Sequence, residues 1–414
     1  RQLGERDLHT LRSRVLWMQV NRHRGRTREM RAEIDALAQD LRSTPGVPAA
    51  DLVVVTKQRA HMEIDDGRYA DAEVTALEAD RLAVARLGED HPEAVGTGLV
   101  LTLSYIYGKK TEAAMQAAER TYRRALGAAG GNHAHPQVIE AQSVYGRALG
   151  EAGDLAGAIR HIGEARDQAA ELFGPTAMMV GYFSQNLVGH QIDVGDLEGA
   201  RANSERAVAI LSTVAAPTSY SVAAALRARG LALLRSGLTH DAVTALEEAV
   251  AGLTQSVGET HEATLTAGLE LVLARAASGR RTDLAASRDA IAALAAAVER
   301  LPSPSALLRA RTFHALGSVD RAMGRFDAAL GAQRAAIAAL GEGPAADRMR
   351  MRALGEVGAN QLALGRWEEA SATLADALAR YERLEPHETP ERRALAAALR
   401  RARGQARGEA ASGS

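Results

Sequence analysis

A short phrase recurs along this chain at nearly constant spacing. Each copy has a glycine and, in most cases, an alanine five positions later, as in Gly153 with Ala158 and Gly237 with Ala242. The glycines of the nine copies are Gly25, Gly67, Gly108, Gly153, Gly195, Gly237, Gly279, Gly324 and Gly365. Successive glycines lie 41 to 45 residues apart. Such a period indicates that one structural unit is stacked many times.

A second marker stands about twenty residues ahead of the glycines. It is proline in six copies and glutamate in one: Pro92, Pro136, Pro175, Pro217, Pro304, Pro344 and Glu262. Proline suits the first turn of a helix, and glycine suits the residue just past a helix end. The markers therefore predict a first helix from each proline to each glycine, and a second helix of about fifteen residues after the glycine.

Small residues recur at fixed places within the unit. Glycine stands seven residues before the turn glycine in several copies (Gly146, Gly230, Gly317, Gly358), and alanine stands five and twelve residues after it. This pattern resembles the tetratricopeptide repeat, in a long form of about 42 residues similar to the kinesin-light-chain variety. The resemblance implies an all-α fold, a right-handed superhelical solenoid of about nine antiparallel helix pairs. It also implies that the chain holds peptides or partner proteins.

The repeats divide the chain into three predicted parts. These are a leading Arg-rich helix or linker at 1–21, the solenoid at 22–384, and a final helix with a disordered end at 385–414. The copy at Gly108 is irregular, because its second-helix phrase fits better from Ala118 to Leu126, five residues later than this glycine predicts. The chain opens with Arg1 rather than Met, which suggests a segment of a longer protein.

The charge balance gives no sign of a nucleic-acid or membrane partner for the whole chain. Lys and Arg number 50 against 51 Asp and Glu, so there is no net field to attract a polyanion. Arginines cluster between Arg12 and Arg28, but with Trp17 as their one neighbouring aromatic residue they favour a solvated helix over a nucleic-acid contact. No apolar run is long enough to span a membrane, and the chain has no cysteine. We expect a cytoplasmic protein.

No set of reactive residues with catalytic spacing is present, so we expect no enzyme activity and no cofactor in this chain. His261-Glu262 begins like a zinc-protease helix, but Leu265 stands where the second histidine should be. His133 and His135 are the one close histidine pair, and no third ligand follows nearby, so we predict no metal. His91 and His261 share one loop position in two repeats, which favours a helix-capping role.

The resemblance places the partner-binding surface on the concave face of the first helices. Counting back six, ten and thirteen residues from the turn glycines selects its predicted residues: Lys57, His61, Ser143, Arg147, Tyr182, Gln185, Arg227, Arg311, His314 and Arg352. Their polar and basic character favours an acidic segment or a free terminal carboxylate as partner. The alternative is that each is an ordinary solvated side chain.

Two functional hypotheses remain. In the first, the chain is an interaction scaffold or sensor arm of a bacterial signalling protein, with a kinase or nucleotide-binding domain upstream in the same polypeptide. In the second, its groove takes a small peptide or metabolite and the superhelix changes shape on binding.

Overall fold

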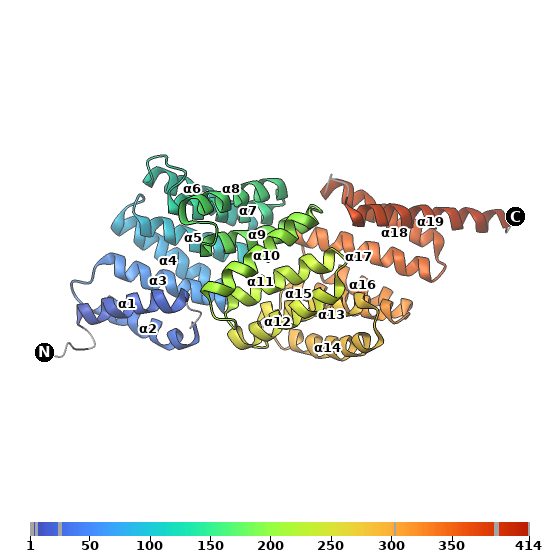
Figure 1. Cartoon of the computed structure of the whole chain (residues 1–414), viewed down its shortest axis with the longest axis horizontal. Helices are drawn as coiled ribbons and strands as arrows, with labels where there is room; N and C mark the ends of the chain where they lie inside the picture. Colours follow the sequence, from blue (N-terminus) through green and yellow to red (C-terminus); the bar gives the residue numbers. More distant parts are fainter. Residues whose placement is uncertain (1–3, 5–6, 24–26, 302–303, 385–388, 413–414) are drawn as a thin grey trace. The chain divides into compact units, whose positions relative to one another are not determined.

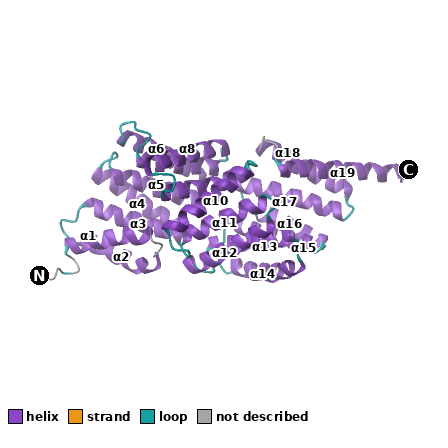
Figure 2. Ribbon diagram, in the orientation of Figure 1, coloured by secondary structure: helices purple, strands orange, loops and turns teal. Residues whose placement is uncertain are grey.

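The computed structural model describes residues 4, 7–23, 27–301, 304–384 and 389–412, and every regular element in these ranges is an α-helix (Figures 1 and 2). Nine pairs follow one another, each made of an odd-numbered A helix and an even-numbered B helix, and α19 follows the last pair. The A helices, with α19, are α1 (Leu8–His23), α3 (Ala49–Asp65), α5 (Pro92–Tyr107), α7 (Pro136–Ala152), α9 (Met178–Asp193), α11 (Tyr220–Arg235), α13 (Glu262–Ser278), α15 (Ala306–Ala322), α17 (Pro344–Ala363) and α19 (Pro390–Ser412). The B helices are α2 (Thr27–Ser43), α4 (Tyr69–Leu87), α6 (Thr111–Ala128), α8 (Leu155–Phe173), α10 (Leu197–Val214), α12 (Thr239–Val257), α14 (Arg281–Glu299), α16 (Phe326–Ala339) and α18 (Trp367–Leu384). The predicted all-helical repeat fold of nine helix pairs is confirmed.

The repeat glycines set where the B helices begin. Seven B helices start two residues after their glycine, at Tyr69, Leu155, Leu197, Thr239, Arg281, Phe326 and Trp367. The seven glycines have φ between 68° and 95°, a left-handed conformation in which a Cβ is strained. These positions are therefore glycine for a conformational reason. The copy predicted at Gly25 lies outside the described residues.

The third repeat departs from this rule by one residue. Gly108 has φ −73°, and Lys109 takes the left-handed conformation instead with φ 58°. Helix α6 consequently begins at Thr111, three residues after the glycine. Ala114, five residues after Lys109, is fully buried. The register therefore moves by one residue, and the five-residue shift suggested by the phrase from Ala118 is wrong.

The predicted starts of the A helices are confirmed to within three residues of each marker. Pro92, Pro136, Glu262 and Pro344 are the first residues of α5, α7, α13 and α17. After the other three prolines the helix starts two or three residues later, at Met178, Tyr220 and Ala306.

Histidines cap three of the A helices. The Nδ1 of His91 accepts a hydrogen bond from the Glu93 amide at 3.1 Å, and His261 accepts one from Ala263 at 3.1 Å. The capping role predicted for this loop position is confirmed, since each ring satisfies one of the free N–H groups of a helix N-terminus. His135 caps α7 in the same way at 3.3 Å.

The small residues lie where helices of one pair cross. A Cβ added to Gly230 would stand 2.5 Å from Leu246 Cγ, and one added to Gly358 would stand 2.5 Å from Leu374 Cγ. The alanines five and twelve residues after the turn glycines are fully buried: Ala72, Ala158, Ala200, Ala242, Ala329 and Ala370, then Ala79, Ala165, Ala207, Ala249, Ala336 and Ala377. Close backbone approach therefore explains why so much of the chain is alanine and glycine.

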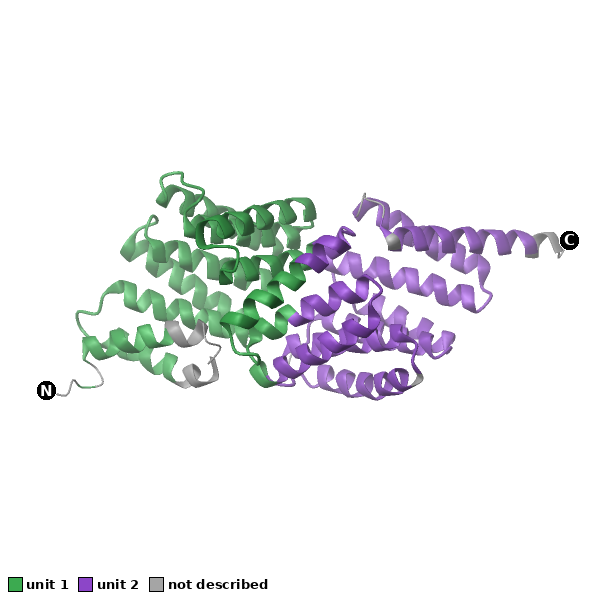
Figure 3. Ribbon diagram, viewed as in Figure 1, with its two compact units in different colours: residues 1–190, 203–225, 255–257 green, residues 191–202, 226–254, 258–414 purple. Residues whose placement is uncertain are grey.

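The chain forms two compact units, which are coloured separately in Figure 3. Unit 1 comprises residues 1–190, 203–225 and 255–257, and unit 2 comprises residues 191–202, 226–254 and 258–414. Each unit has its own apolar clusters. One in unit 1 joins Leu11, Met18, Leu37 and Val55 from the first helices, and one in unit 2 joins Leu265, Ile291 and Val319.

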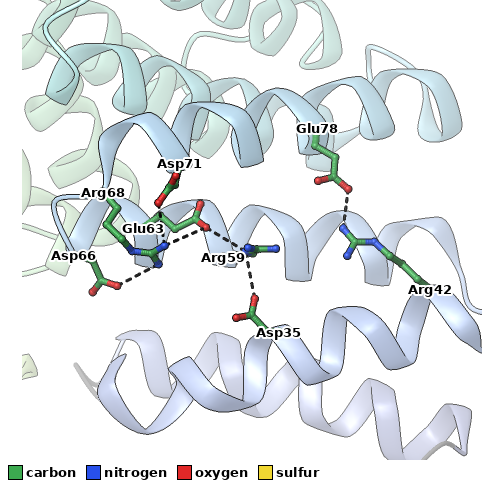
Figure 4. Close-up of polar contacts among 8 residues, drawn as sticks. All are labelled: Asp35, Arg42, Arg59, Glu63, Asp66, Arg68, Asp71 and Glu78. Carbon is green, nitrogen blue, oxygen red and sulfur yellow. Dashed lines mark hydrogen bonds and ion pairs between the residues drawn. The ribbon is translucent and has the colours of Figure 1, made fainter.

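Ion pairs link neighbouring helices near the start of unit 1 (Figure 4). Glu63 of α3 is 1% exposed and lies 3.1 Å from Arg59 Nε on the same helix. Arg59 also contacts Asp35 of α2 at 3.3 Å, and Arg42 of α2 contacts Glu78 of α4 at 2.7 Å. Arginine in this part of the chain thus links one helix to the next.

Candidate functional site

The predicted binding residues lie on A helices, so the arrangement of these helices decides which of them can act together. Within unit 1 the helices α3, α5 and α7 contact one another in succession, and within unit 2 so do α13, α15 and α17. The B helices of the same stretches, α4, α6 and α8 in unit 1 and α14, α16 and α18 in unit 2, make no comparable contact with one another. In a stack of helix hairpins the side with the closer neighbours is the inner side of the curve. We call the exposed surface of successive A helices within one unit the A-helix face.

In unit 1, Lys57 joins two successive A helices. Its Nζ lies 2.6 Å from Glu93 Oε2 of α5, and the two side chains are 14% and 23% exposed. His61, four residues later on α3, is half-buried. The predicted cation at this position is therefore neutralised by the next repeat.

Arg147 of α7 is held by an aromatic ring. Its guanidinium carbon lies 5.2 Å from the centroid of the Tyr107 ring, a cation–π contact. Tyr107 is in turn stacked on Tyr69, with centroids 5.8 Å apart and the planes 12° apart. Burial by itself lowers the pKa of Arg147, but attraction to Tyr107, a hydrogen bond with it, and attraction to Glu151 and Tyr220 together outweigh burial, so the pKa is raised. Ser143, one turn earlier, is buried.

The predicted residues on α9 lie mainly against the core. Tyr182 packs on an apolar cluster that includes Val180, Phe183 and Leu187. Gln185 has a buried Oε1 that finds no hydrogen-bond donor among the described residues. Tyr69, two residues after its turn glycine, likewise packs between repeats through its stack on Tyr107.

In unit 2, Arg227 of α11 forms a two-pronged pair with Glu270 of α13. Its Nε lies 2.6 Å from Oε2 and its Nη2 lies 2.6 Å from Oε1. The two side chains are 29% and 12% exposed. Both carboxylate oxygens of Glu270 are thereby occupied in the geometry that favours arginine over lysine.

Arg352 of α17 is also paired. Its Nη2 lies 2.8 Å from Asp193 Oδ1, and Arg348 on the same helix lies 3.4 Å from Asp193 Oδ2. One carboxylate thus bridges two guanidinium groups four residues apart on one helix face.

His314 of α15 is held by a glutamine. Its Nδ1 lies 2.9 Å from Gln333 Oε1, while Gln333 Nε2 donates to the His314 carbonyl at 3.2 Å. Because that second bond fixes which end of the amide faces the ring, Nδ1 is the protonated nitrogen and Nε2 is left as an acceptor. Burial lowers the pKa of His314, and Arg352 and Arg235 add to this, while Gln333 and Glu356 oppose it.

Arg311, three residues before His314, is the exception among the four predicted arginines. No hydrogen bond or ion pair joins its side chain to any described residue. It is half-buried, and burial lowers its pKa, with Glu270 opposing the effect and Arg227 adding to it. Burial therefore leaves this guanidinium poorly hydrated.

The structure brings only part of the predicted set together. Lys57, His61, Ser143, Arg147, Tyr182 and Gln185 belong to unit 1, and Arg227, Arg311, His314 and Arg352 belong to unit 2. In unit 2, Arg311 interacts electrostatically with Arg227 and Arg352, and His314 with Arg352. We call these four residues, together with Arg348, Asp193, Glu262 and Glu270, the unit 2 arginine cluster.

The acidic partners of these cations are not among the residues predicted from the sequence. Glu93 follows Lys57 by 36 residues and Glu270 follows Arg227 by 43 residues, and Lys109 pairs with Glu151 at a separation of 42. These separations are close to one repeat. A search for opposite charges one repeat apart could therefore have found them.

Other parts of the surface do not coincide with the predicted residues. A depression of about 480 Å³ beside α6 is lined by both signs of charge, including Asp90, Arg120 and Arg124. Arg124 is already bound to Asp80 at 2.8 Å. His133 contacts the Tyr122 hydroxyl at 3.3 Å, and no metal-binding group of three His, Asp or Glu side chains occurs within the described residues.

Two of the arginines near the start of the chain form ion pairs with other helices. Arg12 pairs with Asp51 at 3.2 Å, and Arg14 pairs with Glu33 and Asp40. Arg24 and Arg26 lie outside the described residues. In the part of the chain that the structure describes, no helix combines the length and the apolar character needed to cross a bilayer.

Stacked helix pairs with small residues at their crossings define a protein of the tetratricopeptide-like repeat class. No protein-family model and no curated protein sequence matches the chain. Among solved structures it is similar to a Rap protein complexed with competence and sporulation factor, with 11% identity over 96% of this chain and 99% of that one, at a TM-score of 0.56. It is also similar to the apo form of the quorum sensor NprR from B. thuringiensis, with 12% identity over 82% and 89% of the two chains, at a TM-score of 0.52. A human IFIT1 dimer with PPP-AAAA is 14% identical over 97% and 86%, at a TM-score of 0.52. At these identities the likeness shows a common fold.

Proposed function

We propose that this chain is an interaction scaffold or sensor arm of a bacterial signalling protein and binds a peptide or protein segment on its A-helix face. The observation that carries the proposal is the recurrence of half-buried polar and charged side chains six, ten or thirteen residues before the turn glycine on several A helices. Three of these side chains extend towards the neighbouring A helix: Lys57, Arg147 and Arg227. Burying apolar side chains there would cost less free energy than burying charged ones. Polar groups kept at such positions are typical of binding surfaces.

The similar structures support a regulatory role of this kind. One of them is complexed with competence and sporulation factor, and another is a quorum sensor. They also favour the second candidate, a sensing domain that binds a small peptide or metabolite and changes the shape of the helix stack. In either case the partner would meet a cytoplasmic protein, and a kinase or nucleotide-binding domain upstream of Arg1 would carry the output.

Peptide selection tests the proposal. A random peptide library is selected on the intact chain, and hydrogen–deuterium exchange then locates the enriched peptides. We expect slower exchange in A helices such as α5 and α7, or α13 and α15. Protection confined to B helices, or failure to enrich any peptide, would contradict the proposal.

The two candidates differ in what binding does to the molecule. Small-angle X-ray scattering with and without the selected peptide should show a changed radius of gyration for a sensor and an unchanged radius for a scaffold. Sequencing the gene upstream of Arg1 tests the output domain, because a start codon near Arg1 would exclude it.

A further inference from the structure

Two sets of ion pairs join the beginning of unit 2 to its end. Asp193, the last residue of α9, lies 2.8 Å from Arg352 Nη2 and 3.4 Å from Arg348 Nε of α17. Arg235, the last residue of α11, pairs with Glu391 of α19. These partners are 159 and 156 residues apart, whereas the pairs Lys57–Glu93 and Arg227–Glu270 span 36 and 43 residues. The contacts therefore link helix pairs that lie four repeats apart along the chain.

A close contact between two turns accompanies the ion pairs. A Cβ added to the turn glycine Gly195 would stand 3.1 Å from Thr389 Cγ2 and 3.5 Å from Thr389 Cβ. Thr389 is 1% exposed, and its hydroxyl accepts a hydrogen bond from the Arg392 amide at 3.2 Å. The start of α19, capped by Thr389, therefore packs on the turn between α9 and α10.

With these contacts, the A helices of unit 2 form a closed cycle. Helix α11 contacts α13 through Arg227 and Glu270, and α13, α15, α17 and α19 follow one another in contact. Helix α19 then returns to α11 through Glu391 and Arg235. In an open solenoid each repeat contacts its neighbours alone. Unit 2 therefore has an additional interaction that holds its two ends together.

We propose that the two sets of ion pairs and the Gly195–Thr389 contact form one clasp, which closes unit 2 and opens as a whole. The five charged side chains of the clasp are 14% to 37% exposed, so salt screens their attraction and each pair contributes little by itself. A closure held by such contacts is reversible, because the closed and open arrangements differ little in free energy.

The two sets of ion pairs also share one electrostatic environment. Burial lowers the pKa of Arg235, and Arg352 adds to this effect, while Glu391, Tyr381 and Asp193 oppose it. Three members of the unit 2 arginine cluster, Asp193, Arg348 and Arg352, thereby act on the pair at the start of α19. Loss of one set of pairs should consequently weaken the other.

Thiol modification measures opening without any partner. The chain has no cysteine, so Thr389→Cys supplies a single thiol, which the closed clasp buries. The reagent 5,5′-dithiobis(2-nitrobenzoic acid) reaches this thiol in the open form, so the modification rate follows the open population when reclosing is fast. Thr56→Cys is the matched control, because Thr56 of α3 is also 1% exposed but lies in unit 1.

We expect Asp193→Asn to raise the modification rate at position 389 about tenfold, which corresponds to about 1.4 kcal/mol. Both ion pairs of Asp193 go to α17, so this effect on α19 requires the clasp to open as a whole. Glu356→Gln removes the partner of Arg321 in a pair between successive A helices and should leave the rate unchanged. Sodium chloride at about 1 M, where the Debye length is about 3 Å, should accelerate the parent more than Asp193→Asn.

Two results would overturn the clasp. Acceleration by Glu391→Gln but not by Asp193→Asn would mean that the start of α19 frays alone. Equal rates in the parent and in both variants would mean that the ion pairs do not hold unit 2 closed.

A disulfide across the clasp tests its consequence for binding, a step that rests on the proposed function. Gly195→Cys with Thr389→Cys places two Cβ atoms 3.5 Å apart, within the range of a disulfide. A random peptide library is selected in parallel on the oxidised variant, on the same variant after reduction, and on Asp193→Asn. If the left-handed backbone at position 195 prevents folding, the parent chain at low salt serves as the closed form.

Peptides that protect α13 and α15 from hydrogen exchange should be enriched on the open forms and lost on the closed one. Peptides that protect α5 and α7 should be retained by all forms, since the clasp lies in unit 2. Equal enrichment of unit 2 peptides on closed and open forms would show that the clasp does not control access. If no form enriches a unit 2 peptide, the proposed function fails for unit 2, and the thiol rates by themselves decide whether the clasp opens.

Discussion

At the scale of single residues, the partner of an arginine decides its role more than its place in the repeat does. Arg147, Arg227 and Arg352 occupy positions that the repeat assigns to binding, yet a tyrosine ring, a glutamate and an aspartate already hold them. Arg311 occupies the position equivalent to that of Arg352, thirteen residues before the turn glycine, without such a contact among the described residues. The four residues are therefore expected to respond differently to the same substitution.

Replacing Arg227 by alanine should destabilise unit 2. The substitution leaves Glu270, whose side chain is 12% exposed, without its two-pronged partner. We expect a loss of about 1–3 kcal/mol in the free energy of unfolding, measured by chemical denaturation. The double variant Arg227→Leu with Glu270→Leu is the control and should recover most of this loss. An unchanged midpoint in the single variant would show that the pair contributes nothing.

The stability of unit 2 should fall in mild acid because of His314. Its pKa is lowered in the folded chain, chiefly by burial, so the folded state takes up a proton less readily than the unfolded state. The contribution is complete above the unfolded pKa of about 6.5 and is lost as the pH falls through and below that value.

Denaturation of the parent chain and of His314→Gln at about pH 7.5 and about pH 5.5 measures this contribution. The parent should lose more stability between the two pH values than the variant does. Equal losses would mean that other groups account for the acid sensitivity.

At the scale of helices, small residues control how closely the members of a pair approach. Ala249 of α12 is fully buried at the position twelve residues after the turn glycine. Ala251, two residues later on the same helix, is exposed. The two alanines therefore have the same helix propensity, but one side chain is buried and the other is exposed to solvent.

Ala249→Leu should overpack the helix crossing and cost about 1–3 kcal/mol, visible as a lower denaturation midpoint. Ala251→Leu is the matched control and should change the midpoint little. If both variants melt alike, the repeat register assigned to α12 is incorrect.

At the scale of the whole chain, stability should be shared along the repeats rather than concentrated in one core. Each helix pair contacts mainly its neighbours within a unit, as in α4 with α5 and α16 with α17. Repeat arrays of this kind lose stability stepwise when terminal repeats are removed.

Removing residues 344–414 cuts the chain at a repeat junction after Gly343. We expect a soluble, helical fragment with a lower melting temperature, as measured by circular dichroism. The fragment also loses Arg352 and Arg348, so Asp193 becomes unpaired and unit 2 should be weakened more than unit 1. Complete unfolding of the fragment would indicate a single global core instead.

The sequence by itself determined the repeat, the helix pairs and the residues at their crossings. It could do so because these depend on local chemistry: a left-handed turn needs glycine, a first turn accepts proline, and a close crossing needs alanine or glycine. The sequence did not predict the one-residue shift at Lys109, because no residue type in the repeat pattern indicates that a lysine takes the left-handed conformation.

Only the tertiary structure decided which predicted binding residues are available to a partner. Counting from Gly237 and Gly324 selects Arg227 and Arg311 alike, but whether a guanidinium is neutralised depends on a carboxylate from another repeat. Such pairing depends on the distances between side chains of neighbouring A helices, and the sequence of a single repeat does not determine these distances. Glu270 lies 43 residues beyond Arg227 and meets it because α13 follows α11 as the next A helix, and that contact leaves Arg311 without a carboxylate of its own.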